Sequence, residues 1–334
     1  MSNTQELKSF LSKARKIVIL SHRNPDGDAI GSSMALYLVL NKMGHDSQII
    51  MPSDYPEIYS WFPEIDSIKI FDRNQKETTN LTAEADLVFC LDFNSLDRID
   101  KLGDAINPDK QKIVLIDHHI DPKDFAHHIY LDVKAAATAQ ILYEFFVEIG
   151  WTEHVDSDVA TCLMTGIITD TGSFKYNASS NLFKVTAEVM SHGVDYGDLQ
   201  NKLFNSLDEK YLHLLGYCLA RRMEILNELK TGIITLSKQD YINFDIKRGD
   251  TEGIVNYMLM AKNIEVAVLI TAQPNIVKFS FRSKGNISVQ KLARLHFNGG
   301  GHENASGGYM HSSLFAAQDK LKNVLPDFMN AYLN

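Results

Sequence analysis

The sequence predicts an α/β protein of two domains: an N-terminal parallel sheet with helices on both faces, and a smaller C-terminal mixed α/β domain. At 334 residues the chain is longer than a single core usually supports. Its first half alternates continuous apolar runs with stretches of helical period, which indicates strands buried on both faces. Its second half mixes short strands and helices. We expect the domains at residues 1–192 and 216–334, joined by a connecting helical region at 193–215.

The N-terminal elements follow from these apolar runs. Each expected strand is a short apolar run bounded by polar residues, and each expected helix is longer and amphipathic. The strands are expected at 16–20, 47–51, 87–91 and 113–116, and the helices at 29–43, 135–149, 158–168 and 182–191. Ligand sites in parallel sheets lie beyond the carboxyl ends of the strands. We therefore expect the functional residues at that edge.

The C-terminal elements are shorter and more varied. A long helix is expected at 209–226 and a terminal helix from about residue 314, with a glycine-rich loop before the latter. Between them the pattern predicts strands at 232–236, 265–271 and 277–282, and helices at 251–261 and 288–297.

Composition narrows the class of protein. The net charge of −9 argues against a protein that coats long nucleic acid, although local positive charge can still bind a small anion. No apolar run reaches the roughly 18 residues of a membrane span, and the polar N-terminus lacks a signal-peptide core. We expect a cytoplasmic protein with no membrane partner. Cys90, Cys162 and Cys218 lie apart in apolar surroundings, which predicts buried thiols rather than disulfides or a metal pair.

Acidic and imidazole side chains follow three of the predicted strands. They are His22, Asp26 and Asp28 after the first, Asp92 after the third, and Asp117, His118 and His119 after the fourth, with Asp170 after a later helix. Carboxylates crowded in one place repel, and some would take up protons. Two divalent cations sharing one carboxylate would remove this repulsion. The set lacks thiolates and suits borderline metals. Asp117 could instead orient the neighbouring histidines.

These motifs resemble a known family. "HRNPDGDAIGSS", the aspartate of "LDFNS", "IDHH" and "GIITDTGSF" resemble, in order, the four motifs of the DHH phosphoesterases. The segment "GGGHENASGG" at 299–308 resembles the signature of the DHHA1 domain that accompanies them. The two-domain length resembles the bifunctional oligoribonuclease and PAP phosphatase branch, the nanoRNase type, where PAP is 3′-phosphoadenosine 5′-phosphate.

The resemblance implies a role for each residue. His22 and Asp26 would bind one metal ion, usually manganese in this family, and Asp28, His118 and Asp170 a second. Asp92 would bridge both ions and so take part in catalysis. His119 would contact the scissile phosphate or protonate the leaving oxygen.

The second domain is expected to bind the substrate's phosphate, with the active site in a cleft between the two domains. Glycine-rich turns let backbone amides approach a phosphate closely, and an arginine can bind one with two hydrogen bonds. The residues expected to do this are Arg282, Gly299, Gly300, Gly301, His302 and Ser306. A base could stack on Phe281, Phe297 or Tyr309, and the sequence does not choose among them.

The predicted function is two-metal, Mn-dependent hydrolysis of phosphoesters. The expected substrates are very short single-stranded oligoribonucleotides, cut to mononucleotides, and PAP, which would lose its 3′-phosphate. Long duplexes are not expected. The alternatives are hydrolysis of linear or cyclic dinucleotides, exopolyphosphatase or pyrophosphatase activity, and a non-catalytic nucleotide-binding sensor. A homodimer is left open.

Overall fold

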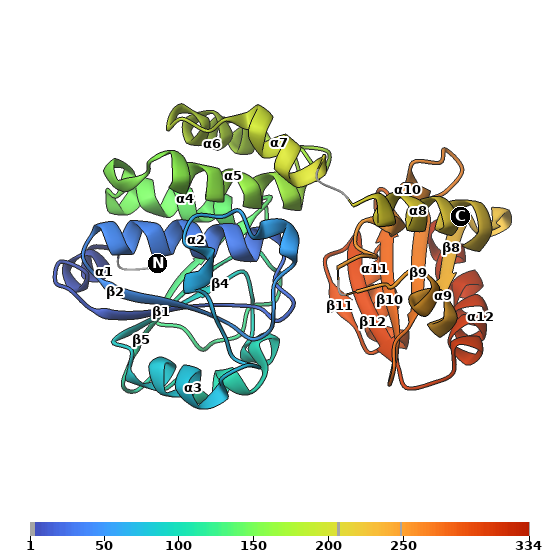
Figure 1. Ribbon diagram of the computed structural model, residues 1–334, viewed down its shortest axis with the longest axis horizontal. Helices are drawn as coiled ribbons and strands as arrows, with labels where there is room; N and C mark the ends of the chain where they lie inside the picture. The colour runs from blue at the N-terminus through green and yellow to red at the C-terminus, as the bar shows by residue number, and fades with distance from the viewer. Residues whose placement is uncertain (1–3, 206–207, 248, 334) are drawn as a thin grey trace. The chain divides into compact units, whose positions relative to one another are not determined.

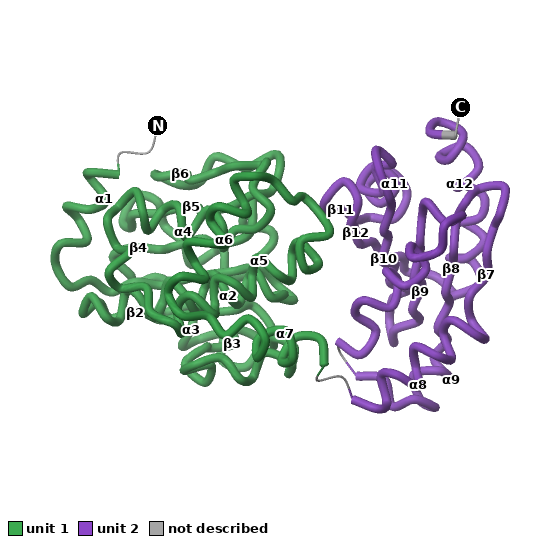
Figure 2. Tube along the Cα trace, turned by 90° about the horizontal axis from the view of Figure 1, so that it is seen from above, with its two compact units in different colours: residues 1–206 green, residues 207–334 purple. Residues whose placement is uncertain are grey.

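The protein folds into two compact units, residues 1–206 and 207–334, each with its own sheet (Figures 1 and 2). We describe a computed structural model that covers residues 4–205, 208–247 and 249–333. The division between the units falls inside the 193–215 segment that was expected to connect the domains. In the described part of the chain, no helix is both long and apolar enough to cross a bilayer.

The first unit contains a six-stranded sheet whose pairs are parallel. Its order is β3-β2-β1-β4-β5-β6, with bounds Lys16–Ser21 (β1), Asp46–Met51 (β2), Lys69–Ile70 (β3), Leu87–Leu91 (β4), Lys112–Asp117 (β5) and His128–Leu131 (β6). The four predicted strands are confirmed. The edge strands β3 and β6 were not predicted, because neither forms a continuous apolar run.

Helices cover both faces of this sheet, as predicted (Figure 1). Along β1, Ile17 and Ile19 enter one core, whereas Val18 and Leu20 enter a second core on the opposite face. The first core packs under four helices: α2 (Gly27–Lys42), α4 (Thr138–Ile149), α5 (Ser157–Thr171) and α6 (Ser180–Ser191). On the other face of the sheet lies α3 (Gln75–Glu84). The remaining helices of the unit are α1 (Thr4–Phe10) and α7 (Tyr196–Phe204). Strands buried on both faces explain the continuous apolar runs.

The helices α2 and α5 pack unusually closely because glycines lie at their contact. A Cβ added to Gly31 of α2 would lie 2.4 Å from the Cys162 carbonyl oxygen of α5. A Cβ added to Gly166 of α5 would lie 2.5 Å from the Asp28 carboxylate and 2.7 Å from the Ala139 side chain. The contact therefore leaves room for the Asp28 carboxylate between α2, α4 and α5.

The second unit contains a six-stranded mixed sheet in the order β11-β12-β10-β9-β8-β7. Only the β8–β9 pair among its described strands is parallel. The strand bounds are Met223–Leu226 (β7), Thr231–Leu236 (β8), Val266–Ala272 (β9), Val277–Ser283 (β10), Gly300–Gly301 (β11) and Ala305–Met310 (β12). The helices are Glu209–Tyr217 (α8), Lys238–Asn243 (α9), Ile254–Leu259 (α10), Val289–His296 (α11) and Leu314–Leu333 (α12). One core lies between the sheet and α11 and α12, and the other between the sheet and α8 and α10.

Two predictions for this unit are corrected by the structure. The helix expected at 209–226 ends as an α-helix at Tyr217, continues as a π-helical turn (Cys218–Arg222), and gives way to β7. Pairing of β7 with β8 outweighs the local helical period. The glycine-rich segment at 299–308 is largely a hairpin of β11 and β12 rather than a loop. The three cysteines are free and buried, as expected.

Candidate active site

Polar side chains gather at the carboxyl edge of the first sheet, where β1, β4 and β5 lie side by side. His22 follows β1 and Asp92 follows β4. Asp117 ends β5 and is followed by His118 and His119. The three strand ends that were singled out in the sequence therefore meet at one edge, as parallel pairing requires.

The N-terminus of α2 adds two carboxylates to this edge. Asp26 is the N-cap, and its Oδ1 accepts hydrogen bonds from the N–H groups of Asp28 and Ala29 at 3.1 Å each. Asp28 is buried and accepts hydrogen bonds from the N–H groups of Thr138 and Ala139, at 2.6 and 2.9 Å. These are the first residues of α4, whose N-cap residue, Ala137, carries no polar side chain. Asp28 therefore caps α4, and the positive end of that helix stabilises its charge.

Asp92 lies at the centre of the cluster. Its Oδ2 is 3.4 Å from Nε2 of His22, and its Oδ1 is 3.5 Å from Nε2 of His118. The same His118 nitrogen is 3.3 Å from Oδ2 of Asp170 at the end of α5. The Thr138 hydroxyl donates a hydrogen bond of 3.0 Å to Asp92 Oδ1. The backbone of Asp92 has φ 64°, a left-handed conformation that is uncommon for non-glycine residues.

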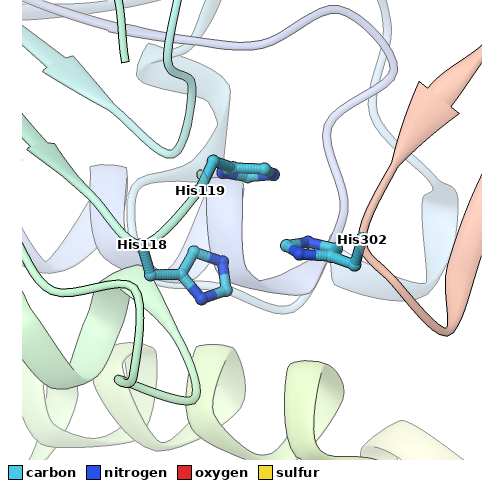
Figure 3. A group of neighbouring side chains, drawn as sticks. All are labelled: His118, His119 and His302. Atoms are coloured by element: carbon cyan, nitrogen blue, oxygen red, sulfur yellow. The ribbon is translucent and has the colours of Figure 1, made fainter. Parts of the chain in front are cut away.

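Each histidine is oriented by a partner at its Nδ1 atom. Nδ1 of His22 lies 2.9 Å from the Arg23 carbonyl oxygen, and Nδ1 of His118 lies 3.3 Å from that of Ala135. Because a carbonyl oxygen can only accept, Nδ1 carries the proton, and Nε2 faces the carboxylates. Nδ1 of His119 lies 2.7 Å from Oδ1 of the buried Asp117. Figure 3 shows the rings of His118 and His119 extending from the segment that follows β5.

Electrostatics in the cluster reflect its crowding. Burial, together with the nearby charge of Asp92, raises the pKa of Asp28; burial and the charge of Asp28 raise the pKa of Asp170. Burial also acts against ionised Asp92, but hydrogen bonds with His118 and His22 outweigh it and hold its pKa well below the usual range. Burial likewise opposes charge on His22, but its hydrogen bond with Asp92 and the charges of Asp26 and Asp92 raise its pKa to about 9. Protons on imidazoles and carboxyls thus supply the positive charge that cations could supply instead.

The residues present fit a pair of divalent cations. One potential ligand from each of His22, Asp26 and Asp92 lies within 4.8 Å of the others, and so does one from each of Asp28, Asp92 and His118. The two sets overlap at Asp92. Their donors are carboxylate oxygens and imidazole nitrogens, which suit divalent ions of the magnesium, manganese and zinc classes. The cluster therefore has the composition of a two-cation site with one shared carboxylate.

The residues expected to bind phosphate lie together in the second unit. Gly299, Gly300, Gly301, His302 and Ser306 belong to the β11–β12 hairpin, and Arg282 on β10 pairs with Ala305 on β12. A Cβ on Gly299 would lie 1.9 Å from the Gly307 carbonyl oxygen, and one on Gly301 would lie 2.7 Å from that of Ala305. Close approach of the hairpin strands thus requires these two glycines. Gly300 faces open space and remains accessible to a ligand.

Two of the three aromatic side chains proposed for base stacking are not available. Phe281 and Phe297 are fully buried in the core between the sheet and α11 and α12. Tyr309 is 41 % exposed. Side chains alternate between the two faces of β10, and Phe281 lies on the inner face; Phe297, at the end of α11, also points inward. Proximity to the glycine-rich motif in sequence did not reveal this burial.

Two residues important to the cluster were missed in the sequence. Thr138 contacts Asp92 through its hydroxyl and Asp28 through its amide. A threonine before an apolar helical stretch is a recognisable helix start, but its distant partners are not encoded locally. Gly166 makes room for Asp28, and a glycine inside a helix is a usable signal because it costs stability relative to alanine.

Comparisons with known proteins identify the family of this chain. Residues 16–167 match the family described as "DHH family, N-terminal domain", and residues 231–334 match the "DHHA1 domain". A "Bifunctional oligoribonuclease and PAP phosphatase NrnA" of Thermus thermophilus is 30 % identical over 294 residues, covering 87 % of this chain and 83 % of the relative. The protein of the same name from Bacillus subtilis is 26 % identical, covering 92 % of this chain and 93 % of the relative.

A solved structure is similar along nearly all of its length. The crystal structure of an exopolyphosphatase-related protein from Bacteroides fragilis has a TM-score of 0.94 and 33 % identity, covering 98 % of this chain and 96 % of that one. The ordered motifs, the two domain matches and this likeness together lead to one conclusion. The chain belongs to the DHH/DHHA1 phosphoesterase family, and its relatives include bifunctional oligoribonucleases and PAP phosphatases.

Proposed function

We propose that this protein hydrolyses very short single-stranded oligoribonucleotides to mononucleotides and removes the 3′-phosphate of PAP. The observation that carries the proposal is the buried Asp92 carboxylate, faced by His22 on one side and His118 on the other. The activities for which the Thermus and Bacillus relatives are named support the choice of substrates, since both relatives align along most of this chain.

We assign the metal ligands from the two overlapping sets and add Asp170, whose Oδ2 lies 3.3 Å from Nε2 of His118. His22 and Asp26 would hold one cation, Asp28, His118 and Asp170 would hold the other, and Asp92 would serve both; manganese is the metal we propose. When bound, such a pair lowers the pKa of a water molecule and stabilises charge on the phosphoryl oxygens. The protein's own part is to keep Nε2 of both histidines directed at the carboxylates and to hold Asp28 against the N-terminus of α4.

His119 is assigned to the reacting phosphate. Asp117 fixes Nδ1 of His119, so the imidazole ring has a defined orientation. A proton carried by this ring can pass to the leaving oxygen or to a phosphoryl oxygen. Asp117 therefore acts by positioning His119, in keeping with its complete burial.

The second unit is assigned to the substrate's terminal phosphate. Arg282 on β10, Gly300 on β11 and His302 in the turn after β11 supply charged and neutral donors from neighbouring segments. Ser306 is buried, and its hydroxyl donates a hydrogen bond of 2.8 Å to the His302 carbonyl oxygen, so its part is to hold this turn. The substitution Arg282→Ala is expected to raise KM for RNA and to leave Mn²⁺ affinity unchanged, because Arg282 is assigned to the phosphate and not to the metal ions. A loss of Mn²⁺ affinity with an unchanged KM would contradict this assignment.

A second candidate follows from the Bacteroides structure, whose description names an exopolyphosphatase relationship. One assay separates the candidates: purified protein with Mn²⁺ is offered RNA of two to five nucleotides, PAP, a cyclic dinucleotide, polyphosphate and pyrophosphate. We expect turnover of RNA and PAP. Turnover of polyphosphate or pyrophosphate alone, or of the cyclic dinucleotide alone, would replace the proposed substrates.

Two variants belong in that assay. Asp92→Asn should abolish turnover of every substrate, because one carboxylate serves both ligand sets. Asp104→Asn, at an exposed position, is the matched control and should behave as the wild type.

A further inference from the structure

The segment directly after Asp170 adopts a strained backbone. Gly172, Ser173 and Phe174 are consecutive left-handed residues, with φ values of 55°, 58° and 66°. Glycine adopts this conformation freely, but serine and above all phenylalanine do so at a cost of roughly 1–3 kcal/mol each. Such strain is kept where surrounding contacts dictate it, and it concentrates at functional sites.

Thr171 supplies the contacts that hold this segment. Its carbonyl oxygen accepts hydrogen bonds from the N–H groups of Lys175 and Tyr176, at 2.9 and 2.8 Å. Its hydroxyl accepts one from the N–H of Phe174 at 2.9 Å, and the residue is fully buried. The N–H of Ser173 donates to the Ile168 carbonyl oxygen at 2.8 Å. The position of Phe174 is therefore fixed by hydrogen bonds around it, four residues beyond Asp170.

The strained segment presents an aromatic pair to solvent. The ring of Phe174 stacks on that of Phe183 in α6, with centroids 5.5 Å apart and planes inclined by 25°. Phe174 is half-buried against the core, whereas Phe183 is 53 % exposed. In the same segment the ammonium group of Lys175 lies 5.2 Å from the centroid of the Tyr176 ring. An exposed ring backed by a second ring, with a cation in the same loop, has the composition of surfaces that bind single-stranded nucleic acid.

We propose that the Phe174–Phe183 pair stacks one nucleobase of the oligoribonucleotide substrate on the open face of Phe183. This inference rests on the proposed function and adds a base-recognition element to it. Every base has a π-face, so stacking here would hold short RNA without selecting its sequence. Lys175 contributes charge for the adjoining phosphate. The pair would thus supply the base-stacking surface that Phe281 and Phe297 cannot supply, because both are buried.

The test measures KM and kcat for RNA trinucleotides with Phe183→Ala, and for three analogues with an abasic ribose at the first, second or third position. For intact RNA we expect KM to rise about tenfold with kcat unchanged, because stacking on an aromatic ring is worth about that factor. For one of the three abasic analogues, Phe183→Ala should leave KM unchanged, because that analogue lacks the base that stacks on Phe183. Phe183→Leu, which keeps apolar volume without a ring, should behave like alanine, and Phe183→Trp should restore KM.

The control is Phe315→Ala in the second unit, where an equally large side chain is 72 % exposed; it should leave KM unchanged. If the wild type cleaves no RNA, the proposed function itself fails. Two results would overturn the stacking role in a wild type that cleaves RNA. In the first, Phe183→Ala changes KM equally for intact RNA and for all three abasic analogues; in the second, Phe183→Ala leaves KM unchanged. A change of oligomeric state in Phe183→Ala, seen by light scattering, would also overturn it and make this surface an interface between copies of the chain.

Discussion

Asp92 combines three conditions that each destabilise a residue: a buried position, a negative charge and a left-handed backbone. Its neighbours offset them. His22 and His118 face one carboxylate oxygen each, and Thr138 donates to the oxygen that faces His118. Such partners fix the direction of a ligand's lone pairs, and losing one typically lowers metal affinity 10- to 100-fold.

Thr138→Val tests this positioning role. The substitution removes the hydroxyl that donates to Asp92 and keeps the backbone N–H that binds Asp28. We expect the Kd for Mn²⁺, measured by calorimetry, to rise about tenfold. Thr186→Val is the matched control, since the buried Thr186 hydroxyl has no hydrogen-bond partner among the described residues. Equal Mn²⁺ affinity in Thr138→Val and the wild type would contradict the role.

Another buried carboxylate, Asp240 in the second unit, stabilises the fold. Burial opposes its charge, but hydrogen bonds from Tyr217, Ser237 and Arg222 outweigh burial and lower its pKa from 3.8 to about 2. Because the folded-state pKa is the lower one, this stabilisation is complete above about pH 4 and disappears as the pH falls through 2. A shift of this size corresponds to roughly 2 kcal/mol.

Asp240→Asn should therefore lower the free energy of unfolding by roughly 2 kcal/mol at pH 7, measured by urea denaturation. The difference between variant and wild type should narrow at pH 3. Asp319→Asn, an exposed aspartate in the same unit, should match the wild type at both pH values. A difference that stays constant between pH 7 and 3 would refute the electrostatic origin.

At the scale of elements, the contact between α2 and α5 sets the geometry of the cluster. Asp26 and Asp28 begin α2, Asp170 lies near the end of α5, and glycines bring the two helices together. Gly31→Ala would place a methyl group against the Cys162 carbonyl, where the backbone cannot yield easily.

We expect Gly31→Ala to destabilise the first unit by about 1–3 kcal/mol, through overpacking, and to lower its Tm in calorimetry. Gly216→Ala in α8 is the matched control, because a Cβ there meets nothing within 4 Å. It should leave stability unchanged or raise it by up to about 1 kcal/mol, since alanine favours a helix over glycine. An unchanged Tm in Gly31→Ala would show that α2 and α5 can move apart freely.

Elements with a strong local pattern could be predicted, and those set by distant pairing could not. The strands β1, β2, β4 and β5 are apolar runs, so the sequence identified them and the polar residues after them. The segment at 223–226 followed a helical period, yet it became β7 because β8 offered a partner. Thr138 escaped prediction for the same reason: its partner Asp92 is distant in sequence and adjacent only after folding.

For the whole molecule, a net charge of −9 coexists with a proposed anionic substrate. Local charge resolves this, because cations between the clustered carboxylates, and Arg282 and His302 in the second unit, would each attract phosphate. Under the proposed function, the clustered carboxylates of the first unit would hold the cations that let an acidic protein bind an anionic substrate.

The number of Mn²⁺ ions bound by each chain tests this account most directly. Calorimetric titration of the metal-free protein should give two ions per chain for the wild type, and Asp92→Ala should weaken binding of both together. Binding of no ion, or two-ion binding that survives Asp92→Ala with unchanged affinity, would contradict the shared-carboxylate centre.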